Sequence, residues 1–282
     1  MGISVFSSAD KVNWQPQKPV FDAPPAWAVN AIPGFKGHIW APDIAYHNGI
    51  YYLYYSVSAF GKNTSCIGVA TNTTLDVQSK DFIGQIMVRY LNPFPAEICG
   101  MLSIRILRLM SNNKPWLTFG SFWSGIKLVK LSSNLINIAQ PEEWYTIAKR
   151  ARDFKTRDDN AGEAAIEAPF IFKMNNYYYL FASFDFWCRG ANGTYRIVAG
   201  RPDKIQGPYI DKAGVRMDEG DGTTILQGNA QWPGVGHNAT YTIDGKDYIL
   251  FHAYDAADGG KPKPKITEII WSADGWPVVT LP

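Results

Sequence analysis

The chain has 282 residues, of which 46% are hydrophobic and 14% aromatic, a composition that supports a buried core and excludes a disordered chain. Its formal net charge of +2, without a run of Lys or Arg, argues against nucleic acid or an anionic membrane surface as a partner. No apolar run has the length of a membrane-spanning helix, and the 3 cysteines are too few and too scattered for a disulfide framework.

One strand pattern recurs four times along the chain. Each copy is a run of aromatic and aliphatic residues that follows a turn rich in Asn or Gly, the residues that supply the positive φ angles of a hairpin. The copies lie at residues 51–56, 115–121, 178–183 and 248–253. Convincing amphipathic helices are absent, so the pattern predicts a repeating all-β architecture.

A second strand follows each of these copies, at residues 67–71, 126–130, 195–199 and 266–270. A fifth example stands at residues 3–8 without an earlier strand before it. Five later strands and four earlier ones predict a five-bladed β-propeller, formed by residues 1–282 as a single domain, with the first blade incomplete at the N-terminus. A large β-sandwich with coincidental repeats is the alternative.

The opening residues 1–6 lack the basic region and the long apolar stretch of a secretory signal peptide. They resemble the middle of a strand instead. We therefore expect that the start of this sequence is placed too late and that the front of blade one lies upstream.

The repeats share an alignment point at Ser56, Ser121, Ser183 and Ala253. In a propeller the first strand of each blade lines the central channel, and counting back 16 residues from each point reaches that strand. The residues found there are Trp40, Arg105, Glu167 and His237. An aromatic ring, a carboxylate and an imidazole from separate blades would suit a channel-lining site.

Glu167 is the only charged residue in the apolar run 165–170. Burying a lone carboxylate is costly because desolvation disfavours its charged form. A position at a strand edge facing solvent is the alternative. Its place among the channel-lining residues favours the interpretation of Glu167 as a general acid.

Five motifs, taken in chain order, resemble glycoside hydrolase family 43 and within it the endo-1,5-α-L-arabinanases. They lie at residues 40–44 (WAPDI), 60–65 (FGKNTS), 120–125 (GSFWSG), 165–170 (AIEAPF) and 252–256 (HAYDA). The resemblance covers nearly the whole chain except about residues 80–110. It implies an inverting hydrolase on a five-bladed propeller that cuts α-1,5-linked arabinofuranose chains of arabinan by endo action.

Enzymes of this kind use three carboxylates: a general base, a second Asp that tunes the pKa of the acid, and an acidic Glu. Inversion needs the base and the acid roughly 6.5–9.5 Å apart, so that a water fits beneath the sugar. Glu167 matches the acid, and its neighbours Ile166, Ala168 and Phe170 should raise its pKa by desolvation.

His237 matches a histidine that faces an ion, calcium or another, in the channel, and no cofactor is implied for the chemistry. A core histidine bonded to a backbone carbonyl is the alternative. The resemblance also implies substrate-binding roles for six residues, with core packing as the alternative for the first two. They are Trp40, Phe60, Asn63, Ser121, Trp123 and Arg189. Asp43 is expected to be a structural residue near the site that bonds the backbone of its loop.

The sequence departs from the family in that two of the three carboxylates are missing. The base belongs to the absent first strand, and no Asp-Pro dipeptide occurs in the chain. Residues 98–110 lack strand alternation and place Arg105 where a carboxylate is expected. Codons for residues 100–106 can be chosen so that a shift of frame yields Asn-Ala-Ile-Asp-Pro-Asn, the family motif. We therefore hypothesise a compensated frameshift across about residues 83–111.

If the sequence is correct as written, the chain should hydrolyse arabinan poorly or not at all, because the base and the pKa-tuning Asp are absent. A non-catalytic carbohydrate-binding propeller is then the alternative function. An exo-acting arabinofuranosidase or xylosidase of the same family is a third. The expected partners are arabinan or arabino-oligosaccharides, with no nucleic acid and no membrane, and the protein should be an extracellular monomer.

Overall fold

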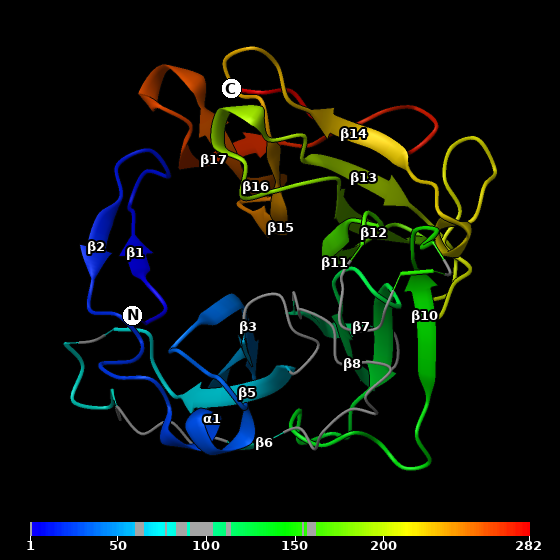
Figure 1. Cartoon of the computed structure of the whole chain (residues 1–282). Coiled ribbons are helices and arrows are strands. Elements are labelled where there is room, and N and C mark those ends of the chain that lie inside the picture. Colours follow the sequence, from blue (N-terminus) through cyan, green and yellow to red (C-terminus); the bar gives the residue numbers. More distant parts are fainter. Residues whose placement is uncertain are drawn as a thin grey trace. The chain divides into compact units, whose positions relative to one another are not determined.

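The protein is described by a computed structural model that covers residues 2–59, 65–76, 78–82, 89–90, 104–110, 114–153, 155–156 and 162–282. Within these ranges β-strands predominate, which confirms the all-β prediction (Figure 1). Helical structure in the described part is limited to α1 (Ala26–Ala31) and three 3₁₀ turns, η1 (Gly190–Asn192), η2 (Met217–Glu219) and η3 (Ala256–Asp258). No helix in the described ranges has the length and apolar character needed to cross a membrane.

The chain forms two compact units. The first consists of Met1–Gly120, Val129–Trp144 and Arg157–Ala161, and the second of Ser121–Leu128, Tyr145–Thr156 and Gly162–Pro282. Strands β9 (Ile126–Lys130) and β10 (Trp144–Ala148) contain residues of both. A single domain spanning residues 1–282 therefore stays a prediction.

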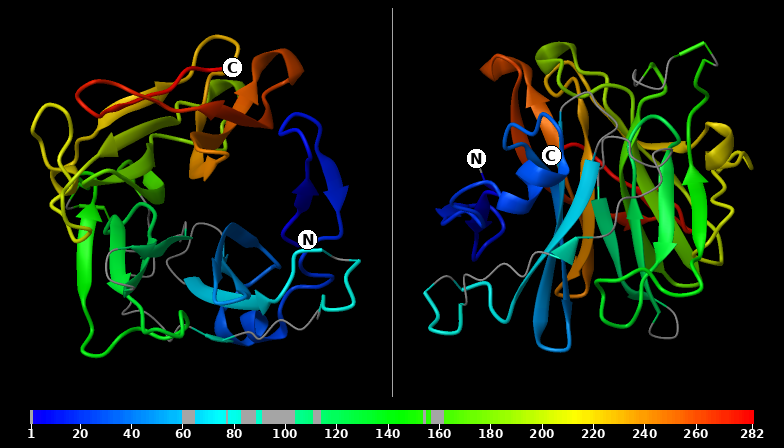
Figure 2. Two further views of the ribbon diagram at one scale, coloured as in Figure 1. Left: turned by 180° about the vertical axis from the view of Figure 1, so that it is seen from behind. Right: turned by 60° about the horizontal axis from the view of Figure 1, so that its bottom comes forward.

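The first unit contains an antiparallel sheet in the order β3-β4-β5-β6. Its strands are β3 (Ile39–His47), β4 (Ile50–Ser58), β5 (Ser65–Asn72) and β6 (Arg89–Tyr90). Two further antiparallel pairs are β1 (Val5–Ser7) with β2 (Gln15–Gln17), and β7 (Ile104–Met110) with β8 (Lys114–Phe119). Ala28 and Ile32, at α1, share a hydrophobic cluster with Tyr55 and Val57 of β4, and Figure 2 shows the blue helix beside the blue and cyan strands.

The second unit contains an antiparallel sheet in the order β11-β12-β13-β14 and another in the order β15-β16-β17. The strands are β11 (Ile166–Met174), β12 (Tyr177–Phe184), β13 (Arg196–Gly200), β14 (Thr223–Gln227), β15 (Val235–Ile243), β16 (Lys246–Asp255) and β17 (Lys261–Glu268), followed by the pair β18 (Ile270–Trp271) and β19 (Pro277–Val278). Phe181 and Phe251 are both at most 2% exposed and share one apolar core between the two sheets.

The recurring strands of the sequence are confirmed as strands. The four copies of the first pattern lie in β4, β8, β12 and β16, and the second pattern falls in β5, β9, β13 and β17 with small shifts at the ends. In the two sheets of the second unit, each first-pattern strand lies between the strand before it and the strand after it, as expected for antiparallel meanders.

Three hairpins share a β-bulge of one residue. The register shifts between Trp40 and Asp43 in β3, between Glu167 and Phe170 in β11, and between Gly236 and Ala239 in β15. The residue after the last regular pair has a positive φ in every case, namely 48° at Ala41, 52° at Ala168 and 54° at His237. A bulge of this type re-aims the side chains on either side of it.

This register corrects the alignment of the last repeat. Trp40 faces Ser56, Glu167 faces Ser183, and Gly236 faces His252. The residue of β15 that corresponds to Glu167 is therefore Gly236, and the predicted position of His237 is wrong by one. The error lies in the alignment point, because the residue types in β16 suggested Ala253 as the equivalent of Ser183, whereas the register places His252 there.

Strand β7 does not follow this pattern. The backbone of Arg105 is opposite Thr118 rather than Ser121, and the register shift lies between Leu107 and Met110, at the far end of the hairpin. The prediction that Arg105 occupies the position of Trp40 and Glu167 is therefore wrong. Residues 83–88, 91–103 and 111–113, which carry most of the hypothesised frameshift, lie outside the described residues.

Candidate active site

Glu167 lies at the last regular pair before the bulge of β11. Its side chain is partly buried, while its neighbours Ile166 and Ala168 are 1% and 0% exposed. Pro169 lies inside the bulge, where its missing N–H breaks no ladder hydrogen bond. The bulge thus presents one carboxylate from an otherwise apolar strand.

Both oxygens of this carboxylate accept hydrogen bonds from side chains of the second unit. The hydroxyl of Tyr195 donates to Oε1 over 2.5 Å, and the hydroxyl of Ser121 donates to Oε2 over 3.1 Å. Tyr195 and Ser121 are 1% and 2% exposed, so neither hydroxyl is fully solvated. The two bonds fix the plane of the carboxyl group.

Ser121 lies at the start of a tight turn. The N–H of Phe122 donates to the carbonyl of Ile166 over 2.7 Å, which fastens the turn beside Glu167. Gly125 closes the turn with φ +80° and an N–H bond to Phe122, and a Cβ at Gly125 would lie 2.3 Å from the carbonyl oxygen of Ala148. Only glycine combines this backbone angle with this closeness.

The ring of Tyr195 is held by its surroundings. A Cβ placed on Gly236 would lie 2.2 Å from Cδ1 of Tyr195, so the ring rests directly on the backbone of β15. The N–H of Val235 donates to the carbonyl of Tyr195 over 2.9 Å. Gly236 therefore leaves room for the phenol that reaches Glu167.

The environment raises the pKa of Glu167 above its ordinary value. Desolvation by burial is the largest cause and favours the neutral acid, and the hydrogen bonds from Tyr195 and Ser121 oppose it in part by stabilising the carboxylate. This direction agrees with the expectation from the apolar neighbours. A carboxyl group with a raised pKa can hold a proton and donate it near neutral pH.

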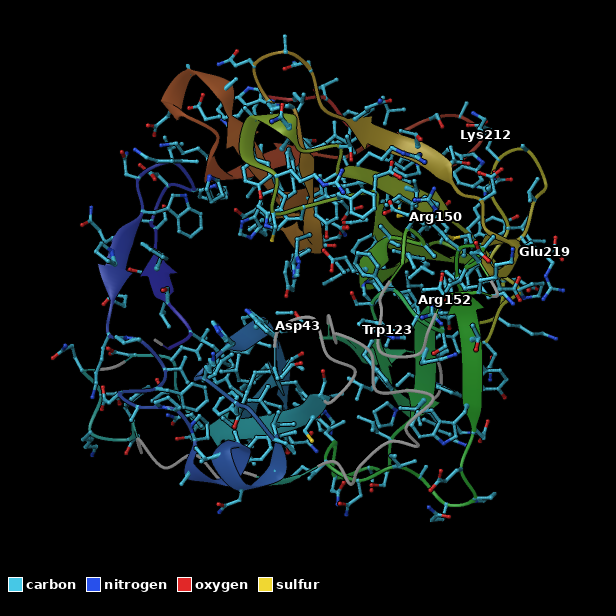
Figure 3. The ribbon with its side chains drawn as sticks, in the orientation of Figure 1. Asp43, Trp123, Arg150, Arg152, Lys212 and Glu219 are labelled. Carbon is cyan, nitrogen blue, oxygen red and sulfur yellow. The ribbon has the colours of Figure 1, made fainter. Side chains whose placement is uncertain are left out.

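An ion network secures the ends of the hairpin that carries Glu167. Asp185, directly after β12, accepts from Arg150 over 2.6 Å and from Arg196 over 2.8 Å. The Arg150 guanidinium also donates to the carbonyl of Ala165, which precedes β11. Figure 3 labels Arg150 beside the green strands. Both oxygens of Asp185 are therefore engaged in ion pairs with a structural role.

His237 occupies the positive-φ position of the β15 bulge. Its backbone N–H donates to the hydroxyl of Ser183, the residue opposite Glu167, over 2.9 Å. Its ring centroid lies 6.0 Å from that of His252. His237 is thus near Glu167 through Ser183, although it is not the residue that corresponds to Glu167 in register.

An aromatic group follows β12 in the same unit. Trp187 stacks on Tyr254 with centroids 3.8 Å apart and rings inclined by 15°, and its centroid lies 5.4 Å from that of Tyr195. The Tyr254 hydroxyl accepts from the N–H of Cys188. The pKa of the Cys188 thiol is raised, first by desolvation and then by the negative charge of Glu167, so this loop lies within electrostatic reach of the acid.

The other predicted residues of the second unit have varied surroundings. Arg189 is exposed, and its guanidinium lies 3.9 Å from the centroid of the Phe186 ring. Trp123, labelled in Figure 3, is partly buried in the turn that delivers Ser121 and contacts Phe122 edge to face. Their substrate-binding roles stay predictions.

In the first unit, Trp40 is partly buried and stacks on His38 with centroids 5.3 Å apart. Asp43 is 4% exposed and lies inside strand β3 directly after the bulge, so its predicted place in a loop is wrong. Phe60 and Asn63 lie outside the described residues.

The predicted ion site depends on the donors around His237. The part of the chain that the structure describes contains no cluster of three or more His, Cys, Asp or Glu side chains suited to a metal. The ring of His252 lies beside that of His237, and imidazoles suit calcium poorly because calcium prefers oxygen ligands. The donors present do not form a calcium site by themselves, and the predicted ion stays a prediction.

The sequence analysis did not identify Tyr195, whose hydroxyl makes the shorter of the two hydrogen bonds to Glu167. A signal was present, because Tyr195 aligns with Ile67, Ile126 and Ile266 in the second recurring strand. A phenol in a position otherwise held by isoleucine needs a partner for its hydroxyl when it is buried. The pattern does not indicate which partner the fold supplies.

The chain has known relatives. Residues 1–277 match the family model of the glycosyl hydrolases family 43. The chain is 46% identical over 278 residues to the extracellular exo-α-(1→5)-L-arabinofuranosidase ArbA of Cellvibrio japonicus, a match that spans 99% of this chain and 80% of that protein. It is 42% identical over 280 residues to the extracellular endo-α-(1→5)-L-arabinanase 1 of Bacillus subtilis, spanning 98% and 79%.

A similar structure is that of Cellvibrio cellulosa α-L-arabinanase complexed with arabinohexaose. Its TM-score is 0.92 at 44% identity, and the match covers 98% of this chain and 88% of that one. The native Bacillus subtilis arabinanase Arb43A matches with a TM-score of 0.79 at 40% identity, over 99% and 89%.

Proposed function

Because the chain belongs to the glycosyl hydrolases family 43, we propose that it hydrolyses α-1,5-L-arabinofuranosidic bonds of arabinan by endo action with inversion. The observation that carries the proposal is Glu167, a carboxyl group with a raised pKa held between two hydroxyl groups. Relatives above 40% identity named as an arabinanase and an arabinofuranosidase support arabinan or its oligosaccharides as the substrate.

In the proposed reaction Glu167 donates its proton to the glycosidic oxygen as the bond from that oxygen to the anomeric carbon breaks. A water attacks the anomeric carbon from the opposite face and loses its own proton to a base, which inverts the configuration. Both products are neutral sugars, and Glu167 is left as a carboxylate. The residue that serves as base is not assigned, since the sequence lacks the expected Asp motifs.

We expect a five-bladed propeller formed by residues 1–282, supported by the three hairpins with one shared bulge. We also expect sugar contacts from the predicted binding residues, an ion near His237, a monomer, and an extracellular location. The extracellular relatives support the last of these.

Exo action on the same bonds is the second candidate, because ArbA, the relative at 46% identity, is named as an exo-acting enzyme. A non-catalytic carbohydrate-binding protein is the third, because the sequence lacks two of the three expected carboxylates. The three differ in products: oligosaccharides of mixed length, one short product from the chain end, or none.

The test is sugar release from linear arabinan by this chain and by its Glu167→Gln variant, with products separated by chromatography over a short time course. We expect a ladder of oligosaccharides from the parent chain and a loss of about 10²–10⁴-fold in the variant, because general acid catalysis contributes that much. A single short product would replace endo with exo action. Binding of arabinan by calorimetry without sugar release would establish the binding protein instead.

A further inference from the structure

Each oxygen of the Glu167 carboxyl group has its own hydroxyl partner, which proton donation alone does not require. Its two oxygens accept from different side chains, and these come from separate parts of the chain, Ser121 from a turn and Tyr195 from the approach to β13. Both residues are almost completely buried. We propose that Tyr195 and Ser121 are positioning residues that confine the transferable proton of Glu167 to Oε2, on the side of Ser121.

The two oxygens of Glu167 have different surroundings, and this matters if Glu167 is the proton donor of the proposed function. A phenol keeps its proton up to about pH 10, so the Tyr195 O–H remains a donor at neutral pH. At 2.5 Å it occupies Oε1. A carboxylic acid carries one proton, and its carbonyl oxygen is a much better acceptor than its hydroxyl oxygen, so this short bond favours Oε1 as the carbonyl oxygen. The proton therefore resides on Oε2.

Ser121 can serve both states of Oε2. A serine hydroxyl donates one hydrogen bond and accepts others. While Glu167 is protonated, Oε2 donates and the Ser121 oxygen accepts. After Oε2 gives its proton to the leaving oxygen, the Ser121 hydroxyl rotates and donates to Oε2 over 3.1 Å. No heavy atom has to move when the charge appears.

The two hydroxyls also strengthen their bonds as the charge develops. Hydrogen bonds to an ionised carboxylate are roughly twice as strong as bonds between neutral groups. Fixed donors aimed at a developing charge lower the barrier without reorganisation. Desolvation favours the protonated acid before the reaction, and the donors stabilise the carboxylate after it.

The backbone of β15 makes Tyr195 rigid enough for this role. Gly236 leaves no side chain between the strand and the phenol ring, and the ring lies so close to the strand that a single added carbon on Gly236 would overlap it. The N–H of Val235 holds the carbonyl of Tyr195. Gly236 is the register equivalent of Glu167, so the same bulge position supplies the acid in β11 and the space for its partner in β15.

The experiment is a carboxyl titration by NMR of the full chain labelled with ¹³C at the glutamate side-chain carboxyl. The Glu167 resonance is identified by its absence from Glu167→Gln. Titrations of Tyr195→Phe and Ser121→Ala are compared with Tyr209→Phe. Tyr209 is a matched control, because it is also 1% exposed and its hydroxyl donates elsewhere, to the carbonyl of Ile205 over 2.8 Å.

We expect the titration midpoint of Glu167 to move to higher pH in Tyr195→Phe and, by less, in Ser121→Ala, because each variant removes a donor that stabilises the carboxylate. Tyr209→Phe should leave it in place. An unchanged or lower midpoint in Tyr195→Phe, or an equal rise in Tyr209→Phe, overturns the proposal. If Tyr195→Phe does not fold, Ser121→Ala decides by the same criterion.

This readout does not depend on hydrolysis. If the parent chain releases no sugar, the proposed function fails while the titration still decides whether the two hydroxyls set the state of Glu167. If the chain is active, Tyr195→Phe should also extend activity to higher pH, since the acid stays protonated longer. It should slow arabinan more than an aryl arabinofuranoside whose leaving group needs no proton.

Discussion

The hairpins β11–β12 and β15–β16 share the same bulged register, but different residues stand at the equivalent position: Glu167 in β11 and Gly236 in β15. Both contain a one-residue bulge that begins at equivalent pairs, Glu167 with Ser183 and Gly236 with His252. In β11 the bulge presents a carboxylate, whereas in β15 it presents a bare backbone. The difference teaches that the bulge orients the residue before it in both hairpins. What packs against that residue then decides whether a side chain or a glycine is needed there.

The largest expected effect on stability comes from adding a side chain at Gly236. Gly236→Ala should lower the free energy of unfolding by about 1–3 kcal/mol, because the added carbon overlaps the ring of Tyr195 in a packed region. Urea unfolding measures this cost. The same substitution in a Tyr195→Ala background should cost far less. If the cost is equal in both backgrounds, the ring is not what excludes a side chain from Gly236.

The next effect tests the hydroxyl that joins the two hairpins. Ser183→Ala removes the acceptor of the His237 N–H and should cost about 1–2 kcal/mol of unfolding free energy. Thr240→Val is the matched comparison, since the hydroxyl of Thr240 is buried and has no hydrogen-bond partner among the described residues.

Thr240→Val should leave stability unchanged or raise it by up to about 1 kcal/mol, because an unsatisfied buried hydroxyl is costly. Thermal and urea unfolding of the two variants measure the difference. A loss in Thr240→Val as large as that in Ser183→Ala would show that Thr240 has a partner and that the two positions are alike.

The stability of the folded chain should depend on pH through the ionisation of Glu167. The folded-state pKa of Glu167 is raised, so the folded chain holds the proton more tightly than the unfolded chain does. The stability this provides is complete below the unfolded pKa of about 4.3 and is lost as pH rises through the folded pKa. Glu167→Gln cannot ionise and should escape this loss.

We therefore expect Glu167→Gln to be more stable than the parent chain at neutral pH and to match it near pH 4. Unfolding by urea at several pH values measures this, with Glu163→Gln at an exposed residue as control. A gain that persists undiminished at pH 4 would point to packing rather than ionisation.

The smallest effect should come from the bulge backbone. Ala168 has φ 52°, a left-handed angle that costs an alanine about 1–2 kcal/mol and glycine nothing. Ala168→Gly should therefore change stability by less than about 0.5 kcal/mol, because relief of strain offsets the entropy that glycine adds to the unfolded chain. Ala182→Gly, in regular strand β12, should cost about 1 kcal/mol, and equal costs would mean that the bulge angle is not strained.

The hydrophobic patterns predicted strand positions well because they depend on neighbours within one strand. The run around residue 180 is almost continuously apolar and recurs along the chain, and it forms β12 as expected. The environment of Glu167 was predicted for the same reason, since its apolar neighbours are adjacent in sequence. The register of His237 was predicted wrongly, because residue types suggested Ala253 as the equivalent of Ser183, and only the pairing of β15 with β16 shows that His252 holds that place.

The sequence by itself determined the family of the chain, its all-β character and the identity of the proposed acid, because recurring short-range patterns and long motifs survive in the order of residues. Only the tertiary structure decided that Ser121 and Tyr195 meet the two oxygens of Glu167, 46 and 28 residues away along the chain. Such contacts depend on strand register and on the close approach at Gly236, and these follow from packing between strands rather than from any single one of them.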